Sequence, residues 1–160
     1  MSTPASIARH PVHPMLIVFP ITFFVAAPVL DIAHLATGDA MWARIAFWDI
    51  VLGIVSALAA AVPGFIDYLS LAGRAARIAT YHMVLNLTVV GLFGVSLLLR
   101  GGAAQTALAG LTWLPVALSI GAALILAVSG WLGGSLVYEH GVGVSRERDA
   151  RETIGRRRAA

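Results

Sequence analysis

The chain has 160 residues, of which 59% are hydrophobic and only 12% are charged, and its mean hydropathy is +0.86. A soluble domain is about 25% charged, so this composition excludes an ordinary soluble domain and indicates a membrane protein. The chain contains no cysteine, which excludes disulfides, thiolate metal sites and thiol redox chemistry.

The apolar residues form four uncharged blocks, at 15–30, 50–66, 78–99 and 101–138. A helix needs about 20 apolar residues to cross the hydrocarbon core of a bilayer, and each block reaches or approaches that length. The first part of the last block, "GGAAQTALAGLTWLP", is only weakly apolar and is typical of a loop. The sequence therefore predicts an all-α, integral membrane four-helix bundle forming a single domain over 1–144. Its spans are expected at about 14–34, 44–66, 80–99 and 114–138.

The positions of the eleven arginines predict the orientation of the bundle. With four spans, both termini and the connection between the second and third spans share one side, and nine arginines lie there. Arg44 and Arg100 lie on the other side. By the positive-inside rule, the N- and C-termini are expected in the cytoplasm. The Arg-rich tail 145–160 mixes both signs with little apolar content, which predicts a disordered cytoplasmic segment and no nucleic-acid binding.

Glycine and proline indicate where helices pack, bend or end. Gly130 and Gly134 have the small-xxx-small spacing that lets membrane helices approach closely, so they are a candidate face for a homo-oligomer. Pro20 and Pro28 are expected to start or kink the first span, and Pro63–Gly64 to end the second. No internal repeat is evident in the sequence.

Polar residues collect at the predicted cytoplasmic ends of all four helices. They stand in "RHPVHP", "GFIDYL", "YHMVLN" and "LVYEHG". The set comprises His10, His13, Asp67, His82, Glu139 and His140. In an antiparallel bundle these ends share one layer. Pro14 favours the first turn of a helix and restricts the backbone of His13. The imidazole of His13 is therefore expected to be held at the N-terminus of the first helix.

This layer has the composition of a cofactor site. Neutral imidazole ligates heme iron, zinc, copper or non-heme iron, so His13, His82, His140 and His10 are candidate ligands. Asp67, Glu139 and Asn86, which lies one turn below His82, would orient the rings from a second shell. The alternative is that all these side chains are ordinary interfacial residues meeting water and lipid headgroups; Glu139 in particular would face solvent.

A second polar layer, formed by Asp31, His34 and Asp49, is expected at the opposite end of the bundle. His13 and Asp31 lie about five turns apart on one helix face, roughly 27 Å along the axis, so one cofactor could not contact both. The expectation for this layer is structural. Asp49 would pair with Arg44, and Asp31 would cap a helix or meet water.

The motifs "HPVHPMLIVFPI", "GFIDYL", "YHMVLN" and "GGSLVYEHGVGV" resemble those of a bacterial four-helix membrane family of unknown function, over residues 9–144. Some members of that family join this module to a Rieske-type iron–sulfur domain. The resemblance implies electron transfer at a bacterial inner membrane, with His13, His82 and His140 as candidate heme or metal ligands. Because this chain lacks cysteine, an iron–sulfur partner would be a separate protein.

Two hypotheses follow for the function. The first is a cofactor-binding electron-transfer protein with a b-type heme between helices, or a divalent metal ion in its place. The second is a non-redox membrane protein, such as a transporter subunit, proton relay or scaffold, with an interfacial polar cluster and no cofactor. Whether the chain is an enzyme is left open, because no HExxH, nucleophile or nucleotide motif is present.

Overall fold

The computed structural model describes residues 3–8, 10–101 and 113–144, and it confirms the predicted all-α four-helix architecture. The helices are α1 (Val12–Leu16), α2 (Val18–Thr37), α3 (Ala40–Tyr68), α4 (Gly73–Leu99) and α5 (Trp113–Tyr138). Two short antiparallel strands, β1 (Ser6–Ile7) and β2 (His10–Pro11), precede them. The weakly apolar loop before α5 and the Arg-rich tail lie outside the described residues.

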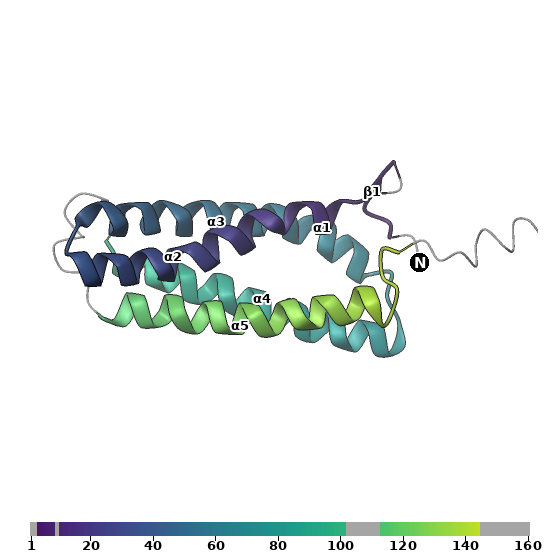
Figure 1. The fold of residues 1–160 in the computed structure, drawn as a ribbon. Coiled ribbons are helices and arrows are strands. Elements are labelled where there is room, and N and C mark those ends of the chain that lie inside the picture. Colours follow the sequence, from purple (N-terminus) through teal and green to yellow (C-terminus); the bar gives the residue numbers. More distant parts are fainter. Residues whose placement is uncertain (1–2, 9, 102–112, 145–160) are drawn as a thin grey trace, which may run out of the picture.

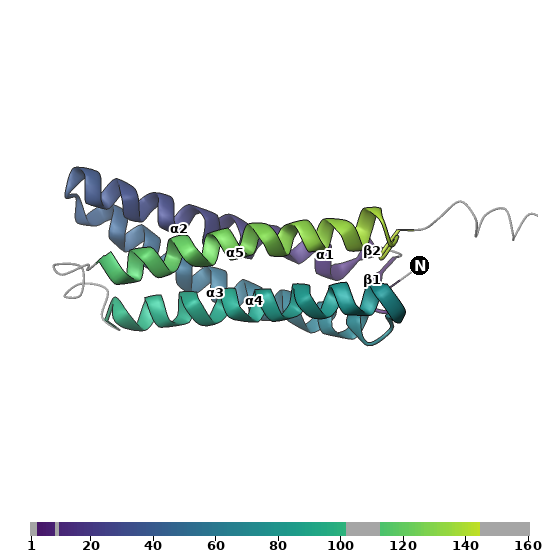
Figure 2. The same ribbon diagram turned by 90° about the horizontal axis from the view of Figure 1, so that it is seen from below.

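The helices form two antiparallel hairpins, α2 with α3 and α4 with α5, which pack against each other (Figures 1 and 2). The N-terminal strands, the α3–α4 turn and the end of α5 lie at one end of the bundle, called here the terminal end. The α2–α3 turn and the start of α5 lie at the opposite end, called the far end.

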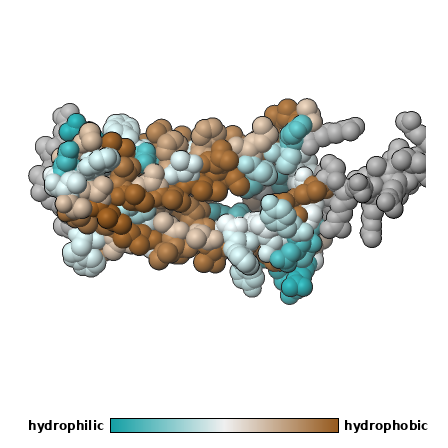
Figure 3. Space-filling model, in the orientation of Figure 1, coloured by the Kyte–Doolittle hydropathy of each residue, from teal (hydrophilic) through white to brown (hydrophobic). Residues whose placement is uncertain are grey.

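All four spans are long and apolar enough to cross a membrane, with mean hydropathies between 2.0 and 2.2. Large hydrophobic side chains cover the outside of the bundle, and polar groups gather at its two ends (Figure 3). In water such a surface would be unstable, but lipid is an apolar solvent for it. The structure is therefore that of a bundle whose outer face meets lipid.

Proline changes the helices less than the sequence predicts. The first span is continuous from Val12 to Thr37 except at Ile17. That interruption lies next to Leu16, whose carbonyl loses its usual partner because Pro20 has no N–H. The prediction that Pro63–Gly64 ends a helix is wrong, because α3 continues to Tyr68. Membrane helices tolerate proline where neighbouring groups satisfy the freed carbonyls.

The third span begins earlier than expected. Helix α4 starts at Gly73, so Arg74 and Arg77 belong to its first two turns and not to a loop. Pairing between Tyr68 and Thr80, whose hydroxyl oxygens are 3.0 Å apart, supports the tight α3–α4 turn. The two arginines remain at the terminal end, as the orientation argument requires.

The two hairpins form an internal repeat that the sequence reading missed. Three residue pairs meet across the centre of the bundle: His13 with His82, Phe24 with Phe93, and Asp31 with Arg100. In every pair the partners are 69 residues apart. When a residue contacts the residue at the equivalent position of the other repeat, the two lie beside a two-fold axis that relates the repeats. The hairpins are therefore related by a pseudo-two-fold axis along the length of the bundle.

The middle of this axis is the apolar core. The rings of Phe24 and Phe93 stack with centroids 4.2 Å apart and planes 5° from parallel. Gly53 makes room for Phe24, because a Cβ there would lie 2.5 Å from the ring. The remaining buried members of the core cluster are Ala27, Ile50, Val89, Ala122 and Leu126.

Candidate functional site

His13 is held inside the first hairpin by the backbone of α3. Its Nδ1 lies 2.8 Å from the carbonyl oxygen of Ala60. The ring rests on Gly64, where a Cβ would come within 2.6 Å of Nδ1. Gly64, which was expected to end a helix together with Pro63, therefore lies inside α3 and makes room for the imidazole ring, of which it forms the seat.

His82 is held in the same way inside the second hairpin. Its Nδ1 lies 2.8 Å from the carbonyl oxygen of Ser129 on α5 and 3.1 Å from the hydroxyl oxygen of the same residue. Gly133 supplies the seat, since a Cβ there would lie 3.1 Å from Cε1 of the ring. In both hairpins the histidine and its carbonyl partner are 47 residues apart, and the glycine follows that partner by one helical turn.

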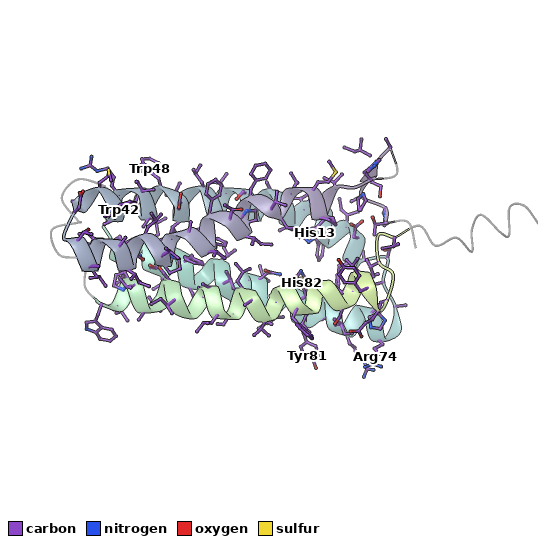
Figure 4. All side chains as sticks on the ribbon, in the orientation of Figure 1. His13, Trp42, Trp48, Arg74, Tyr81 and His82 are labelled. Carbon is purple, nitrogen blue, oxygen red and sulfur yellow. The ribbon has the colours of Figure 1, made fainter. Side chains whose placement is uncertain are left out.

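The two rings face each other across the seam between the hairpins. Their centroids are 6.4 Å apart and their planes are 89° from parallel. Figure 4 shows His13 and His82 extending from opposite hairpins toward each other. We call these two side chains the histidine pair. Both are half-buried.

The hydrogen bonds define which nitrogen of each ring is available. A backbone carbonyl only accepts, so Nδ1 carries the proton in both rings and Nε2 carries the lone pair. Among the described residues, Nε2 of His13 has no hydrogen-bond partner. Nε2 of His82 accepts from the side-chain amide of Asn86 at 3.1 Å. Asn86 was predicted beside His82, but it contacts the nitrogen that a metal would bind and does not orient the ring from behind.

The other members of the predicted layer are placed elsewhere. Asp67 is buried and accepts a hydrogen bond of 2.8 Å from the backbone N–H of Ala5. His10 is exposed, with Nδ1 3.0 Å from the carbonyl of Ala8. Exposed Glu139 follows the end of α5 and accepts from the hydroxyl of Ser135 in that helix.

His140 lies away from the histidine pair, in a cavity beside the α3–α4 turn that is also lined by Ser70 and Arg74. Its Nε2 is buried without a hydrogen-bond partner in the described part of the chain. Among the described residues, no group of three His, Asp or Glu side chains is placed to hold a metal ion. The structure thus brings together two of the three histidines expected to share a ligand.

The layer at the far end differs from the expectation in the role of Asp31. This residue neither caps a helix nor meets water: it is fully buried and paired with Arg100. Nη1 and Nη2 of the arginine donate to the two carboxylate oxygens at 2.7 and 2.5 Å. Hydroxyls of Ser96 and Ser119 accept from the same guanidinium.

The rest of this layer is peripheral. Asp49 is half-buried and Arg44 is exposed, and the expected pair between them is absent from the ion pairs of the described residues. Nδ1 of His34 lies 2.9 Å from the carbonyl of Asp39, the residue that caps α3. The contact of His34 with Asp39 links the end of α2 to the start of α3.

Comparison with known proteins adds a family. Residues 9–146 match the family described as "Predicted membrane protein (DUF2231)". The chain belongs to this family. No curated protein and no solved structure matches the chain. Membership of the DUF2231 family agrees with the four spans and assigns no activity, so the function rests on the geometry of the histidine pair.

Proposed function

We propose that this protein is a membrane electron-transfer protein in which His13 and His82 would hold one b-type heme. The observation that carries the proposal is the histidine pair itself. Two imidazoles from symmetry-related positions face each other across the seam, each with Nδ1 tied to a carbonyl of its own hairpin. Cofactor sites in helix bundles are built from side chains on facing helices in this way.

The separation of the rings suits a shared metal atom. A bond between a metal atom and Nε2 is about 2.0 Å long, and the nitrogen lies about 1.1 Å from the centre of its ring. Two imidazoles on opposite sides of one metal atom therefore have their ring centres about 6.2 Å apart. The observed separation of the centroids is 6.4 Å. The separation of the rings therefore agrees with shared ligation once both Nε2 atoms are turned toward one metal atom.

The number of ligands favours heme over a bare metal ion. A structural zinc site takes four protein ligands and a catalytic one takes three. The histidine pair offers two, and the third candidate for a divalent ion, His140, lies in a different cavity. Heme supplies four nitrogens of its own and needs only two axial ligands.

The residues around the pair have defined tasks in this proposal. The carbonyls of Ala60 and Ser129 accept the Nδ1–H groups, which fixes both ring orientations and makes each Nε2 a stronger donor to a metal. Asn86 must release Nε2 of His82, and it retains its bond of 2.9 Å to the backbone carbonyl of the same residue. The heme iron would supply one-electron chemistry.

A planar group would enter between the hairpins. Figure 3 shows a hollow between the upper and lower hairpins in which hydrophilic residues are visible. The glycine seats at positions 64 and 133 keep the rings close to their own hairpins and leave the seam to the occupant. The apolar surroundings would exclude water and tune the reduction potential.

The proposal extends to the setting of the protein. We place it in a bacterial inner membrane with both termini in the cytoplasm, on the strength of its arginine distribution. Its electron partner would be a separate membrane protein, such as an iron–sulfur protein, because this chain contains no cysteine to ligate a cluster. Gly130 and Gly134 of α5, where a Cβ would meet no atom within 4 Å, would allow a second copy to pack closely.

The non-redox hypothesis has one observation in its favour. Two parallel repeats about an axis along the bundle also occur in secondary transporters, where the substrate site lies between the repeats near the middle of the membrane. Here stacked Phe24 and Phe93 fill the middle of that axis, and a buried ion pair fills the far end. A conduction path would require both contacts to separate.

The proposal is tested by optical spectroscopy of the protein purified in mild detergent from cells supplied with heme. The wild type is expected to show a b-type Soret band and, with dithionite, an α band. His13→Ala and His82→Ala should each lose most of this heme, whereas His34→Ala, at the far end, should retain it. Stoichiometric metal without heme absorbance, or neither, would refute the proposal and favour the metal or the non-redox hypothesis respectively.

A further inference from the structure

We propose that Asn86 competes with the cofactor for Nε2 of His82, and thereby makes the His82 side the weaker and exchangeable position of the site. This inference rests on the proposed heme function and concerns the unequal strength of the two ligands. An exchangeable position would accept small external ligands such as carbon monoxide or cyanide.

The direction of the hydrogen bond is fixed by the geometry. The side-chain nitrogen of Asn86 donates to the backbone carbonyl of His82 at 2.9 Å, and only the amide nitrogen can make that bond. The same nitrogen lies 3.1 Å from Nε2 of His82, so it also donates there. Ser129 and its carbonyl hold Nδ1 of that ring. Both nitrogens of His82 are therefore engaged before any cofactor binds.

His13 lacks such a competitor. The residue that corresponds to Asn86 in the first hairpin, 69 positions earlier, is Ile17, which has no polar side chain. Nδ1 of His13 is held by the carbonyl of Ala60, and Nε2 has no partner among the described residues. The two hairpins thus have equivalent histidines, equivalent carbonyl partners and equivalent glycines. They differ at the position that contacts Nε2, which is Asn86 in the second hairpin and Ile17 in the first.

This asymmetry sets an order of binding. His13 can coordinate without losing a hydrogen bond, whereas His82 must first give up the one from Asn86. A hydrogen bond of this kind contributes about 1 kcal/mol net, which corresponds to about a fivefold effect on an equilibrium. The amide of Asn86 would stabilise the uncoordinated ring of His82, so an external ligand would compete more easily with His82 than with His13.

The test is Asn86→Ile, which gives the second hairpin the residue of the first. Thr88→Val is the matched control, because its hydroxyl bonds only within α4 and is exposed. Asn86→Ile should bind hemin about fivefold more tightly than the wild type, and its ferrous form should bind carbon monoxide about fivefold more weakly. Thr88→Val should match the wild type. Unchanged or weaker hemin binding by Asn86→Ile would overturn the inference.

Nitrogen NMR of the apo protein provides a readout that is independent of heme. The Nε2 resonance of His82 should report a hydrogen-bond acceptor in the wild type and should shift toward that of His13 in Asn86→Ile. Identical Nε2 resonances for the two histidines in the wild type would also overturn the inference. If these resonances behave as expected but the wild type binds no hemin, the proposed function fails while the Asn86 contact stands.

Discussion

The ion pair between Asp31 and Arg100 is expected to be the strongest single link between the two hairpins. Both side chains are completely buried, and both guanidinium nitrogens that face the carboxylate bond to it. Replacing Arg100 by Met would leave the carboxylate buried without a counter-charge. Removing one partner of a buried pair costs about 3–5 kcal/mol, which is a large part of the stability of a small domain.

Replacing both partners should cost much less. The hydroxyls of Ser96 and Ser119 also donate to the carbonyl of Pro115, at 2.8 and 3.0 Å, so they keep partners when the guanidinium is removed. The double variant Asp31→Leu with Arg100→Met would therefore leave no charge and no orphaned hydroxyl. Apolar replacement of a buried ion pair is often neutral. We expect it to recover most of the stability lost in the single variant.

The assay is unfolding in detergent, followed by circular dichroism for the wild type, both single variants and the double variant. A coupling energy of about 2 kcal/mol or more between the two positions is the expected result. Single variants within about 1 kcal/mol of the wild type would refute the reasoning, because they would show that water or lipid headgroups reach the pair.

Three further predictions concern the seat, the core and the orientation. Gly64→Ala places a methyl group 2.6 Å from Nδ1 of His13 and should abolish heme binding. Gly91→Ala, where a Cβ meets no atom within 4 Å, should leave heme binding unchanged. Equal optical spectra for the two variants would show that Gly64 is not needed to hold His13. Phe24→Ala removes a fully buried, stacked ring and should cost about 3–5 kcal/mol in detergent unfolding, and a loss below 1 kcal/mol would mean that the stacked core is not formed. A reporter fused after Ala160 should be active only in the cytoplasm, and periplasmic activity would invert the proposed orientation.

The fold was predictable because membrane helices depend on length and composition alone. Four uncharged blocks were sufficient to locate all four spans. The helix boundaries were predicted less accurately, because a helix such as α4 extends beyond the uncharged block of its sequence. Pro63 misled the prediction because a proline inside a membrane helix need not end it, and α3 continues to Tyr68.

The site was predictable only in part. His13 and His82 were candidates because titratable residues near a membrane are rare and stand out in the sequence, and the structure confirms that their side chains lie together. The glycine seats could not be assigned, because glycine also ends helices and packs against lipid. Arg100 was counted as a loop residue, and nothing in the sequence alone indicated that it reaches Asp31.

The repeat was hidden for a physical reason. Lipid-facing positions accept any apolar residue, so the two hairpins differ at most positions. The positions with a recognisable relation are few, such as Phe24 with Phe93 on the axis and the glycines at 64 and 133 beside the histidines. A search for charged, aromatic or histidine residues at a common spacing of 69 would have detected it.

The most direct test of the central claim is electron paramagnetic resonance of the oxidised, heme-loaded protein. Two imidazoles on one ferric iron would give a low-spin signal. We predict a low-spin signal in the wild type, and a high-spin signal, or none, in His13→Ala and in His82→Ala. A high-spin signal in the wild type, or a wild-type signal unchanged in His13→Ala, would contradict ligation by the histidine pair.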